Sequence, residues 1–394
     1  MLENERSVPK IEFLKDVLIC SLGAYGGPEA HYGIFANQLV EKKRYITEEE
    51  LTELMALTSI LPGPSSTQTI VAIGHKIGGV PLALITMLIW SFPGILIMTA
   101  LSFLGLASKA FHFDPRIFRY IQPMAVAFIL MATYNIGRKV IKSKVALLLF
   151  FFGAILSYFF KGPLVFLGTF LVGGITAILL TKEKNIFNKI TLNPPWKYLG
   201  LFAFFAIGLV VFNMFIDHRL LLLLEKFYRF GYLVIGGGQV VVPLMHGELV
   251  EIHQFMTSQE FLTGYGIVQG VPGPMFSFTA YAGGMAARDL GYLMQVLAAF
   301  ISSIGIFLPG ILLIFFVFPI WEDLKKMRAI KISIGGISPV ACGLIFASAI
   351  GMIQKSGLGL DNILVIIISC LLLLSKKVPA PLMVLSAILL GVLL

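Results

Sequence analysis

The chain has 394 residues and a net charge of +9, and 57% of its residues are hydrophobic while only 13% are charged. Soluble domains carry about 25% charged residues, so this composition excludes an ordinary soluble enzyme or binding module. The basic residues lie in short loops between apolar segments rather than on one face of a soluble domain, which argues against a nucleic-acid partner. The lipid bilayer is the expected surrounding, and the fold class we expect is an all-α polytopic membrane protein.

The start of the chain is charged, and Lys15 and Asp16 interrupt the apolar stretch that follows the first ten residues. This pattern predicts no cleavable signal peptide and an N-terminus inside the cell. Cys20, Cys342 and Cys370 lie far apart in apolar segments, where they form neither a disulfide framework nor a metal-binding spacing. We expect no cofactor and no metal site.

Residues 48–61 have an acidic start and predict a short helix that ends at the turn Pro62-Gly63-Pro64. A second short helix can begin at Ser65, because a proline at a helix opening lacks only an N–H group that would have had no partner. These two half-helices fit a hairpin that re-enters the membrane face from which it started. Non-helical backbone at membrane depth is tolerated only beside protein or a water-filled cavity, so the turn should face a cavity.

Nine segments are apolar and close to the length needed to cross a membrane. They are 80–107, 117–137, 145–160, 163–180, 198–217, 290–319, 332–353, 361–374 and 378–394. The loops on one side of these spans hold more lysine and arginine than the loops on the other side, which places the richer side in the cytoplasm. With nine crossings, the N-terminus lies inside and the C-terminus outside the plasma membrane.

The second half of the chain repeats the first. Gly26-Gly27 and Pro62-Gly63-Pro64 recur 210 residues later (26 to 236, 62 to 272) as Gly236-Gly237 and Pro272-Gly273-Pro274. Phe92-Pro93-Gly94 recurs as Leu308-Pro309-Gly310 after 216 residues, so the second copy holds a short insertion. The predicted organisation is a first repeat at 1–181, a linker with a connecting transmembrane helix at 182–220, and an inverted second repeat at 221–394. Apolar repeats broken by glycine and proline at matching places are typical of secondary transporters whose site lies where the breaks meet.

The turns that follow the two breaks have the chemistry of an oxyanion site. The start of a helix offers free backbone N–H groups and the positive end of the helix dipole. Side-chain donors follow each turn, more of them in the first copy. The predicted substrate-binding residues are Pro62, Gly63, Pro64, Ser65, Ser66, Thr67, Gln68, Pro272, Gly273, Pro274, Ser277 and Thr279. The alternative is that Pro-Gly-Pro is only a kink packed by small residues.

The paired glycine motifs differ in their ionisable groups. After Gly26-Gly27 the chain carries Glu29 and His31, whereas the copy after Gly236-Gly237 has Gln239 and Val241. Ionisable groups inside a membrane are functional candidates, and histidine titrates near neutral pH. We therefore predict that Glu29 and His31 couple transport to protons. The alternative is that this segment lies at the membrane interface with both groups solvated.

The motifs resemble those of a known family. Gly26-Gly27-Pro28-x-Ala30-His31-x-x-x-Phe35 with Pro62-Gly63-Pro64-x-x-x-Gln68, repeated from Gly236 to Met245 and at Pro272-Gly273-Pro274, is similar to the chromate ion transporter family, long-chain two-domain type. The resemblance covers nearly the whole chain. It implies export of chromate, an analogue of sulfate, driven by the membrane potential or the proton gradient, with homologous halves of opposite orientation. The second copy departs from the first, since it has Gly238 in place of Pro28 and lacks the Ala-His pair.

Three alternatives remain beside chromate efflux. A carrier or exchanger of sulfate or another oxyanion would suit the donor-rich turn equally, and a passive channel is a further option that the duplication disfavours. A membrane-embedded lipid-phosphate enzyme would need a nucleophile or base beside an arginine. The turn after Pro64 has no arginine, and His75 and Lys76 lie about three helical turns away, so we expect no enzyme. A counter-ion in place of protons and a homodimer are both compatible with the sequence.

Overall fold

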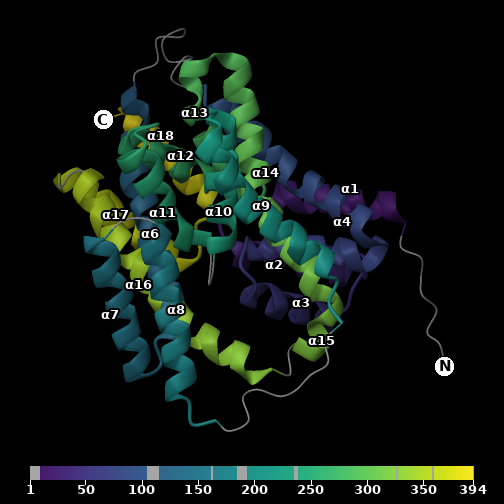
Figure 1. Cartoon of the computed structure of the whole chain (residues 1–394). Helices are drawn as coiled ribbons and strands as arrows, with labels where there is room; N and C mark the ends of the chain where they lie inside the picture. Colours follow the sequence, from purple (N-terminus) through teal and green to yellow (C-terminus); the bar gives the residue numbers. More distant parts are fainter. Residues whose placement is uncertain are drawn as a thin grey trace.

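The computed structural model describes residues 9–103, 115–160, 163–183, 193–234, 238–324, 327–356 and 359–393. In these ranges the protein is built of helices and contains no strand, as Figure 1 shows. The motif glycines Gly236 and Gly237 and the side chain of Glu29 lie outside the described part of the chain. The predicted all-α architecture is confirmed.

The first repeat begins with a helix, continues through a broken segment, and ends in three apolar helices. Its elements are α1 (Lys10–Gly23), α2 (Pro28–Phe35), the π-helical turn η1 (Ala36–Lys42), α3 (Glu48–Ile60), α4 (Ser65–Leu101), η2 (Pro115–Phe118), α6 (Ile121–Val140), α7 (Lys144–Phe159) and α8 (Pro163–Leu180). The long helix α4 is interrupted at Gly78 and at Gly79, whose φ of 71° suits glycine. A short half-helix therefore follows the Pro-Gly-Pro turn, and the membrane-length helix starts after the interruption.

The second repeat follows the connecting helix α9 (Trp196–Phe215) and has the same order of elements. They are α10 (Arg219–Leu233), η3 (Gly238–Val241), α11 (Val242–His246), η4 (Gly247–Ile252), α12 (Ser258–Val268), η5 (Met275–Ser277), α13 (Phe278–Ala286), η6 (Arg288–Leu290), α14 (Tyr292–Val317), η7 (Phe318–Ile320), α15 (Trp321–Leu324), α16 (Arg328–Ser356), α17 (Leu360–Ser375) and α18 (Ala380–Leu393). The 3₁₀ turn η6, with Gly291 after it, lies where the interruption of α4 lies in the first repeat. It accounts for the predicted short insertion.

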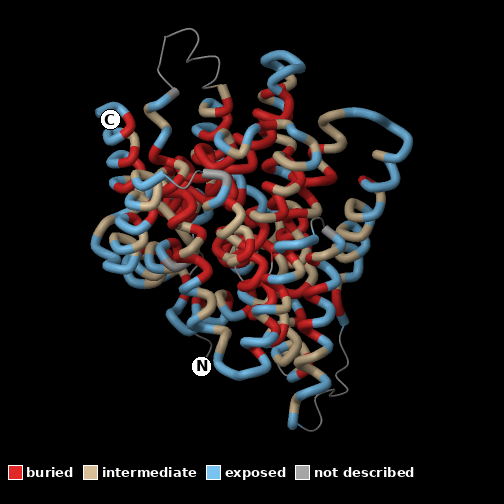
Figure 2. The backbone as a smooth tube through the Cα atoms, turned by 90° about the vertical axis from the view of Figure 1, so that its left-hand side faces the viewer, coloured by how far each residue is buried: buried red, intermediate tan, exposed pale blue. Residues whose placement is uncertain are grey.

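Matching elements of the two repeats lie toward opposite ends of the molecule. In Figure 1, α3 is in the lower part and α12 in the upper part, while α7 and α8 lie below α17 and α18. Each of the nine predicted spans corresponds to one apolar helix, five of membrane length and four shorter. Figure 2 shows the buried stretches of the backbone mostly in the middle of the molecule and the exposed stretches mostly at its edges. Many of the exposed side chains are large and apolar, such as Phe215 of α9, and such a surface fits contact with lipid.

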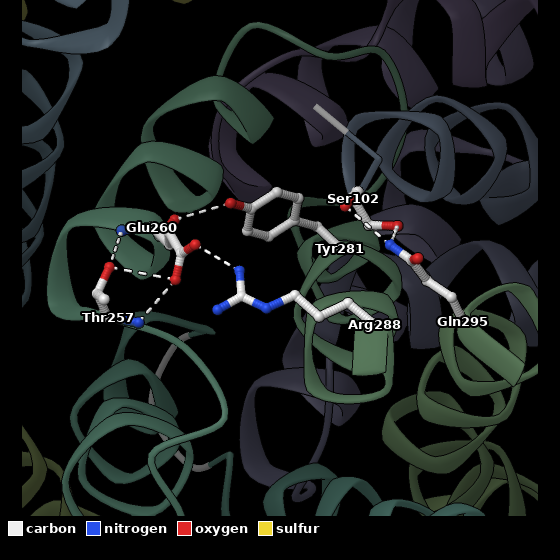
Figure 3. A network of polar contacts seen from close by, with 6 residues as sticks. All are labelled: Ser102, Thr257, Glu260, Tyr281, Arg288 and Gln295. Carbon is white, nitrogen blue, oxygen red and sulfur yellow. Dashed lines mark hydrogen bonds and ion pairs between the residues drawn. The ribbon is translucent and has the colours of Figure 1, made fainter. Parts of the chain in front are cut away.

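A charged contact closes the base of each hairpin of half-helices. Thr47 and Glu50 form a reciprocal capping box at the start of α3, and Thr257 and Glu260 form the same box at the start of α12. Lys76, at the end of the first half-helix of α4, pairs with Glu50, and Arg288 pairs with Glu260 (Figure 3). The structure gives these basic residues carboxylate partners from their own hairpins.

Glu260→Ala should lower the free energy of unfolding by about 1 kcal/mol, because it removes both the capping box and the ion pair. Burial alone would raise the pKa of Glu260, but the contacts from Arg288 and from the Thr257 N–H outweigh it and hold the pKa below 4.5. The stabilisation is therefore present above the ordinary carboxyl pKa and is lost as the pH falls through the lower folded-state pKa. Thermal unfolding in detergent at neutral and acidic pH measures it. Glu49→Ala, at an exposed position of α3, is the control.

Candidate functional site

The two Pro-Gly-Pro turns are each tied to the opposite repeat. The N–H of Gly63 donates to the carbonyl of Val234 at 2.8 Å, and the N–H of Gly273 donates to the carbonyl of Ala24 at 2.9 Å. Ala24 and Val234 are matching residues, each two positions before its Gly-Gly motif. Such a mutual exchange of equivalent contacts is the mark of a two-fold relation between the repeats. Each turn is therefore hydrogen-bonded to the segment that precedes the glycine motif of the other repeat.

Each turn also packs against a kink in the long helix of the opposite repeat. A Cβ on Gly63 would lie 3.1 Å from Cα of Gly310, next to Pro309 in α14. A Cβ on Gly94, next to Pro93 in α4, would lie 2.9 Å from the carbonyl oxygen of Pro272. Only glycine allows backbones to approach this closely. The predicted site residues thus lie at the interface between the repeats, where the helix breaks meet.

The donor side chains of the first turn already have partners within the protein. His31 Nδ1 lies 2.9 Å from Ser66 Oγ, and Trp90 Nε1 donates to Thr67 Oγ1 at 3.1 Å. Gln68 Nε2 donates to the carbonyls of Pro62 at 2.8 Å and Gly310 at 3.1 Å. Ser65, the first residue of α4, is partly exposed. An incoming anion would therefore meet the backbone N–H groups and Ser65 first, and would compete for the other donors.

Two polar atoms of the turns are buried without a hydrogen-bond partner in the described part of the chain. They are the amide oxygen of Gln68 and the hydroxyl of Ser277. Thr279, the other predicted donor of the second turn, donates its hydroxyl to the carbonyl of Phe276 at 2.8 Å in its own turn. The second turn therefore offers mainly Ser277, which agrees with the unequal chemistry expected for the two copies.

The predicted coupling residue His31 lies inside the protein. It is 1% exposed, packs edge-on against Trp90 with ring centroids 5.3 Å apart, and contacts the first turn through Ser66. Its Nε2 has no partner in the described residues. A fully solvated His31, the alternative considered above, does not fit this burial. The proposed role of Glu29 and His31 in coupling remains a prediction.

The first glycine motif lies beside Gln239, which comes two residues after the second glycine motif in the sequence. Gly26 has a φ of 78°, and a Cβ on Gly27 would lie 4.0 Å from Nε2 of Gln239, which occupies the position matching Glu29. The same Gln239 amide lies 3.9 Å from the sulfur of Met275, the residue after the second Pro-Gly-Pro turn. Gly27, Gln239 and the second turn are therefore parts of one interface between the repeats.

A buried charge cluster in the second repeat was not predicted. Lys226 Nζ and Arg229 Nη2 both lie 2.9 Å from Glu248 Oε2, and Arg229 Nε lies 2.8 Å from Glu225 Oε1. The alignment of the two repeats could have indicated this cluster, because it matches polar positions in both copies. Positions 226 and 248 match Asp16 and Gln38 of the first repeat, whose side chains bond at 2.7 Å, so this pair of positions joins α1 to η1 and α10 to η4.

Comparison with protein families matches a model described as chromate transporter to residues 11–178 and 221–392. The chain belongs to the chromate transporter family. The two matched ranges coincide with the two structural repeats and leave out the connecting helix α9. Membership confirms the resemblance noted in the motifs and gives the protein a role in chromate transport at a membrane.

Several relatives match this chain over most of its length. An uncharacterized transporter of Methanocaldococcus jannaschii is 24% identical over 99% of this chain and 96% of its own. A probable chromate transport protein of Synechococcus elongatus is 25% identical over 94% of this chain and 92% of its own. A chromate transport protein of Cupriavidus metallidurans is 23% identical over 93% of this chain and 88% of its own. No solved structure matches the fold.

Proposed function

We propose that this protein is a secondary active carrier that exports chromate across the plasma membrane, driven by the proton motive force. The observation that supports the proposal most directly is that each Pro-Gly-Pro turn is hydrogen-bonded to the opposite repeat. Gly63 and Gly273, bonded to Val234 and Ala24, put two helix breaks at one interface between the repeats. Family membership supports an oxyanion as the substrate.

The oxyanion would bind at the start of α4. The first N–H groups of a helix have no partner within it, and here Gln68 N is the first to bond back, to the carbonyl of Pro64. The N–H groups of Ser65, Ser66 and Thr67 are thus available to an anion together with the positive end of the helix dipole. Ser277 would complete the shell from the second repeat. Donors without fixed charge bind an anion weakly enough for release.

Substituting these donors tests the site directly. Ser66→Ala and Thr67→Val should each weaken oxyanion binding by about ten- to a hundredfold, because a hydrogen bond to a charged ligand contributes about 1.5–3 kcal/mol. Gln68→Ala should weaken binding by a different route, because it removes the bonds to Pro62 and Gly310 that position the turn. Ser277→Ala should have an effect in the same direction. Binding is measured by titration calorimetry on purified protein, with thermal unfolding as the check of folding. If all three first-turn variants bind as tightly as the unmodified protein, the anion is bound elsewhere.

Alternating access would use the breaks as hinges. The half-helix after each turn is separated from the long helix, by Gly78-Gly79 in one repeat and by η6 with Gly291 in the other. A few residues that absorb a change of φ and ψ are sufficient for such a hinge. Exchanging the conformations of two inverted repeats would convert an inward-open state into an outward-open one.

The inverted topology predicts that Lys142→Cys and Leu360→Cys react with impermeant thiol reagents from opposite sides of the membrane. Both positions are exposed and follow matching helices, α6 and α16. Reaction of both from one side would contradict the proposed orientation of the termini and the two-fold site.

Substrate and driving force are tested in proteoliposomes. Uptake of chromate, sulfate, molybdate and phosphate is compared with and without a pH gradient. Chromate should be transported fastest and should respond to the gradient. A preference for sulfate would favour the alternative of a sulfate carrier, whereas flux that never exceeds equilibrium under any gradient would contradict active transport.

A further inference from the structure

A cavity of about 380 Å³ opens beside the second repeat, away from the Pro-Gly-Pro turns. It lies between the end of α7, the start of α8, the end of α16, and the segment formed by α11 and η4. Figure 1 shows α7, α8, α16 and α11 together in the left part of the molecule. Its polar lining includes Ser157, His246, Glu248, Glu251, Ser348 and Gln354. No residue of either turn lines it.

The titratable lining makes this cavity a place for cations rather than anions. Glu248 is 2% exposed, and its Oε2 is bonded to Lys226 and Arg229. Its Oε1 is buried and has no hydrogen-bond partner in the described part of the chain. The described residues that line the cavity include two carboxylates, Glu248 and Glu251, and no lysine or arginine, so the lining disfavours an oxyanion.

Next to Glu248, a histidine faces a second carboxylate. His246 Nδ1 lies 3.5 Å from Glu251 Oε1, and a proton on this imidazole would neutralise that carboxylate. The other charged or titratable groups that face this region balance one another in part. They are Glu225, Lys226 and Arg229 of α10, Glu248 of η4, His253 after η4, Tyr158 of α7, and Glu260 of α12, which is paired with Arg288.

His246 is also in contact with the hairpin that carries the second turn. Its Nε2 lies 2.9 Å from the hydroxyl of Ser258, the first residue of α12. Its ring packs edge-on against Phe261 of α12 at 5.1 Å, and Phe261 packs against Phe278 of α13 at 5.0 Å. Phe278 directly follows Ser277. His246 therefore contacts α12 directly and α13 through Phe261, and these are the two half-helices that flank the Pro272 turn.

The first repeat lacks this arrangement. The positions that match His246 and Glu248 are Ala36 and Gln38, and only the match of Glu251 is also acidic, at Glu41. The first repeat therefore forms the same elements without a histidine at this position. This indicates that His246 is not needed for the fold of these elements.

We infer that the His246–Glu251 pair is a proton-binding site, loaded from the cavity, whose protonation biases the α12–α13 hairpin between its two positions. The inference rests on the proposed function of a proton-driven oxyanion carrier and names where the driving proton binds in the second repeat. It is separate from His31, which contacts the first turn through Ser66.

The test compares His246→Gln and Glu251→Gln with Glu41→Gln, the matched substitution in the first repeat. Each protein is placed in proteoliposomes. Chromate exchange at equal pH on both sides needs no net proton movement and should be unchanged within about twofold in all three. Accumulation driven by a pH gradient, about tenfold per pH unit for one proton in the unmodified protein, should be lost in His246→Gln and Glu251→Gln only.

A second measurement needs no transport. Purified protein is acidified from about pH 8 to about pH 5, and the protons taken up are counted with an indicator dye. His246→Gln should take up about one proton fewer than the unmodified protein. Accumulation and proton uptake like those of the unmodified protein in both variants would overturn the inference, as would an equal loss in Glu41→Gln. Failure of the unmodified protein to exchange any oxyanion would instead contradict the proposed function, and the proton count would still decide the site. If His246→Gln does not fold, Glu251→Gln, whose side chain is 29% exposed, decides both measurements.

Discussion

Gly63→Ala should abolish oxyanion transport and lower the free energy of unfolding by on the order of 3 kcal/mol. The residue has a φ of 130°, which side chains rarely adopt. A Cβ there would lie 2.7 Å from Gln68 Nε2 and 3.1 Å from Cα of Gly310. Moving the turn away from Gly310 would relieve the overlap, but it would also break the bond from the Gly63 N–H to Val234.

The matched glycine of the second turn gives a graded comparison. Gly273 has a φ of 102°, yet a Cβ on it would meet no atom closer than 3.5 Å, so Gly273→Ala should cost only the backbone strain of about 1–2 kcal/mol. Gly208→Ala in α9, where a Cβ has open space, is the control. Thermal unfolding and chromate uptake are measured for all three. A Gly63→Ala protein that transports like Gly208→Ala would contradict a role for the first turn.

Glu248→Gln should lower the free energy of unfolding by about 3–5 kcal/mol, because it leaves a buried ammonium group without its carboxylate. The side chain of Lys226 is 7% exposed, and its ion pair is with Glu248. Arg229 would keep Glu225. The loss should appear as a lower unfolding temperature in detergent.

The double variant Lys226→Met with Glu248→Gln separates charge from packing. It removes both members of the pair and leaves Arg229 with Glu225, so much of the lost stability should return. Gln38→Ala, the matching change in the first repeat, removes a neutral partner of Asp16 and should cost less than Glu248→Gln. A double variant that is less stable than the single one would show that side-chain packing, and not the unpaired charge, sets the loss.

Much of the fold could be predicted because its signals are local or repeated. Apolar runs predicted nine apolar helices, and five of them in the described residues are long enough to cross a membrane. Their ends differ from the predicted ends by a few residues, since composition does not mark the last turn of a helix. The acidic start at Glu48 and the break at Pro62 predicted α3 and the start of α4 correctly. The constant separation of the motifs predicted two repeats that share one order of elements.

The contacts of the site could not be predicted in the same way. Gln68 was expected to donate to a ligand, but its amide is bonded to Gly310 in the other repeat, and nothing near position 68 indicates that neighbour. Trp90, which donates to Thr67, lies in a run of apolar residues that gives no sign of a polar role. No role for His246 could be predicted, because its partners Glu251 and Ser258 lie five and twelve residues further along the chain and no motif links them to it.

The exchange of turns between the repeats has a consequence for biosynthesis. Gly63 finds its carbonyl acceptor at Val234, which leaves the ribosome only after the first repeat and the connecting helix have been made. At about 5–20 residues per second, the first hairpin waits on the order of ten seconds or more in the membrane with its turn unfinished. We therefore expect both turns to reach their native contacts only after the second repeat has been made, and not repeat by repeat.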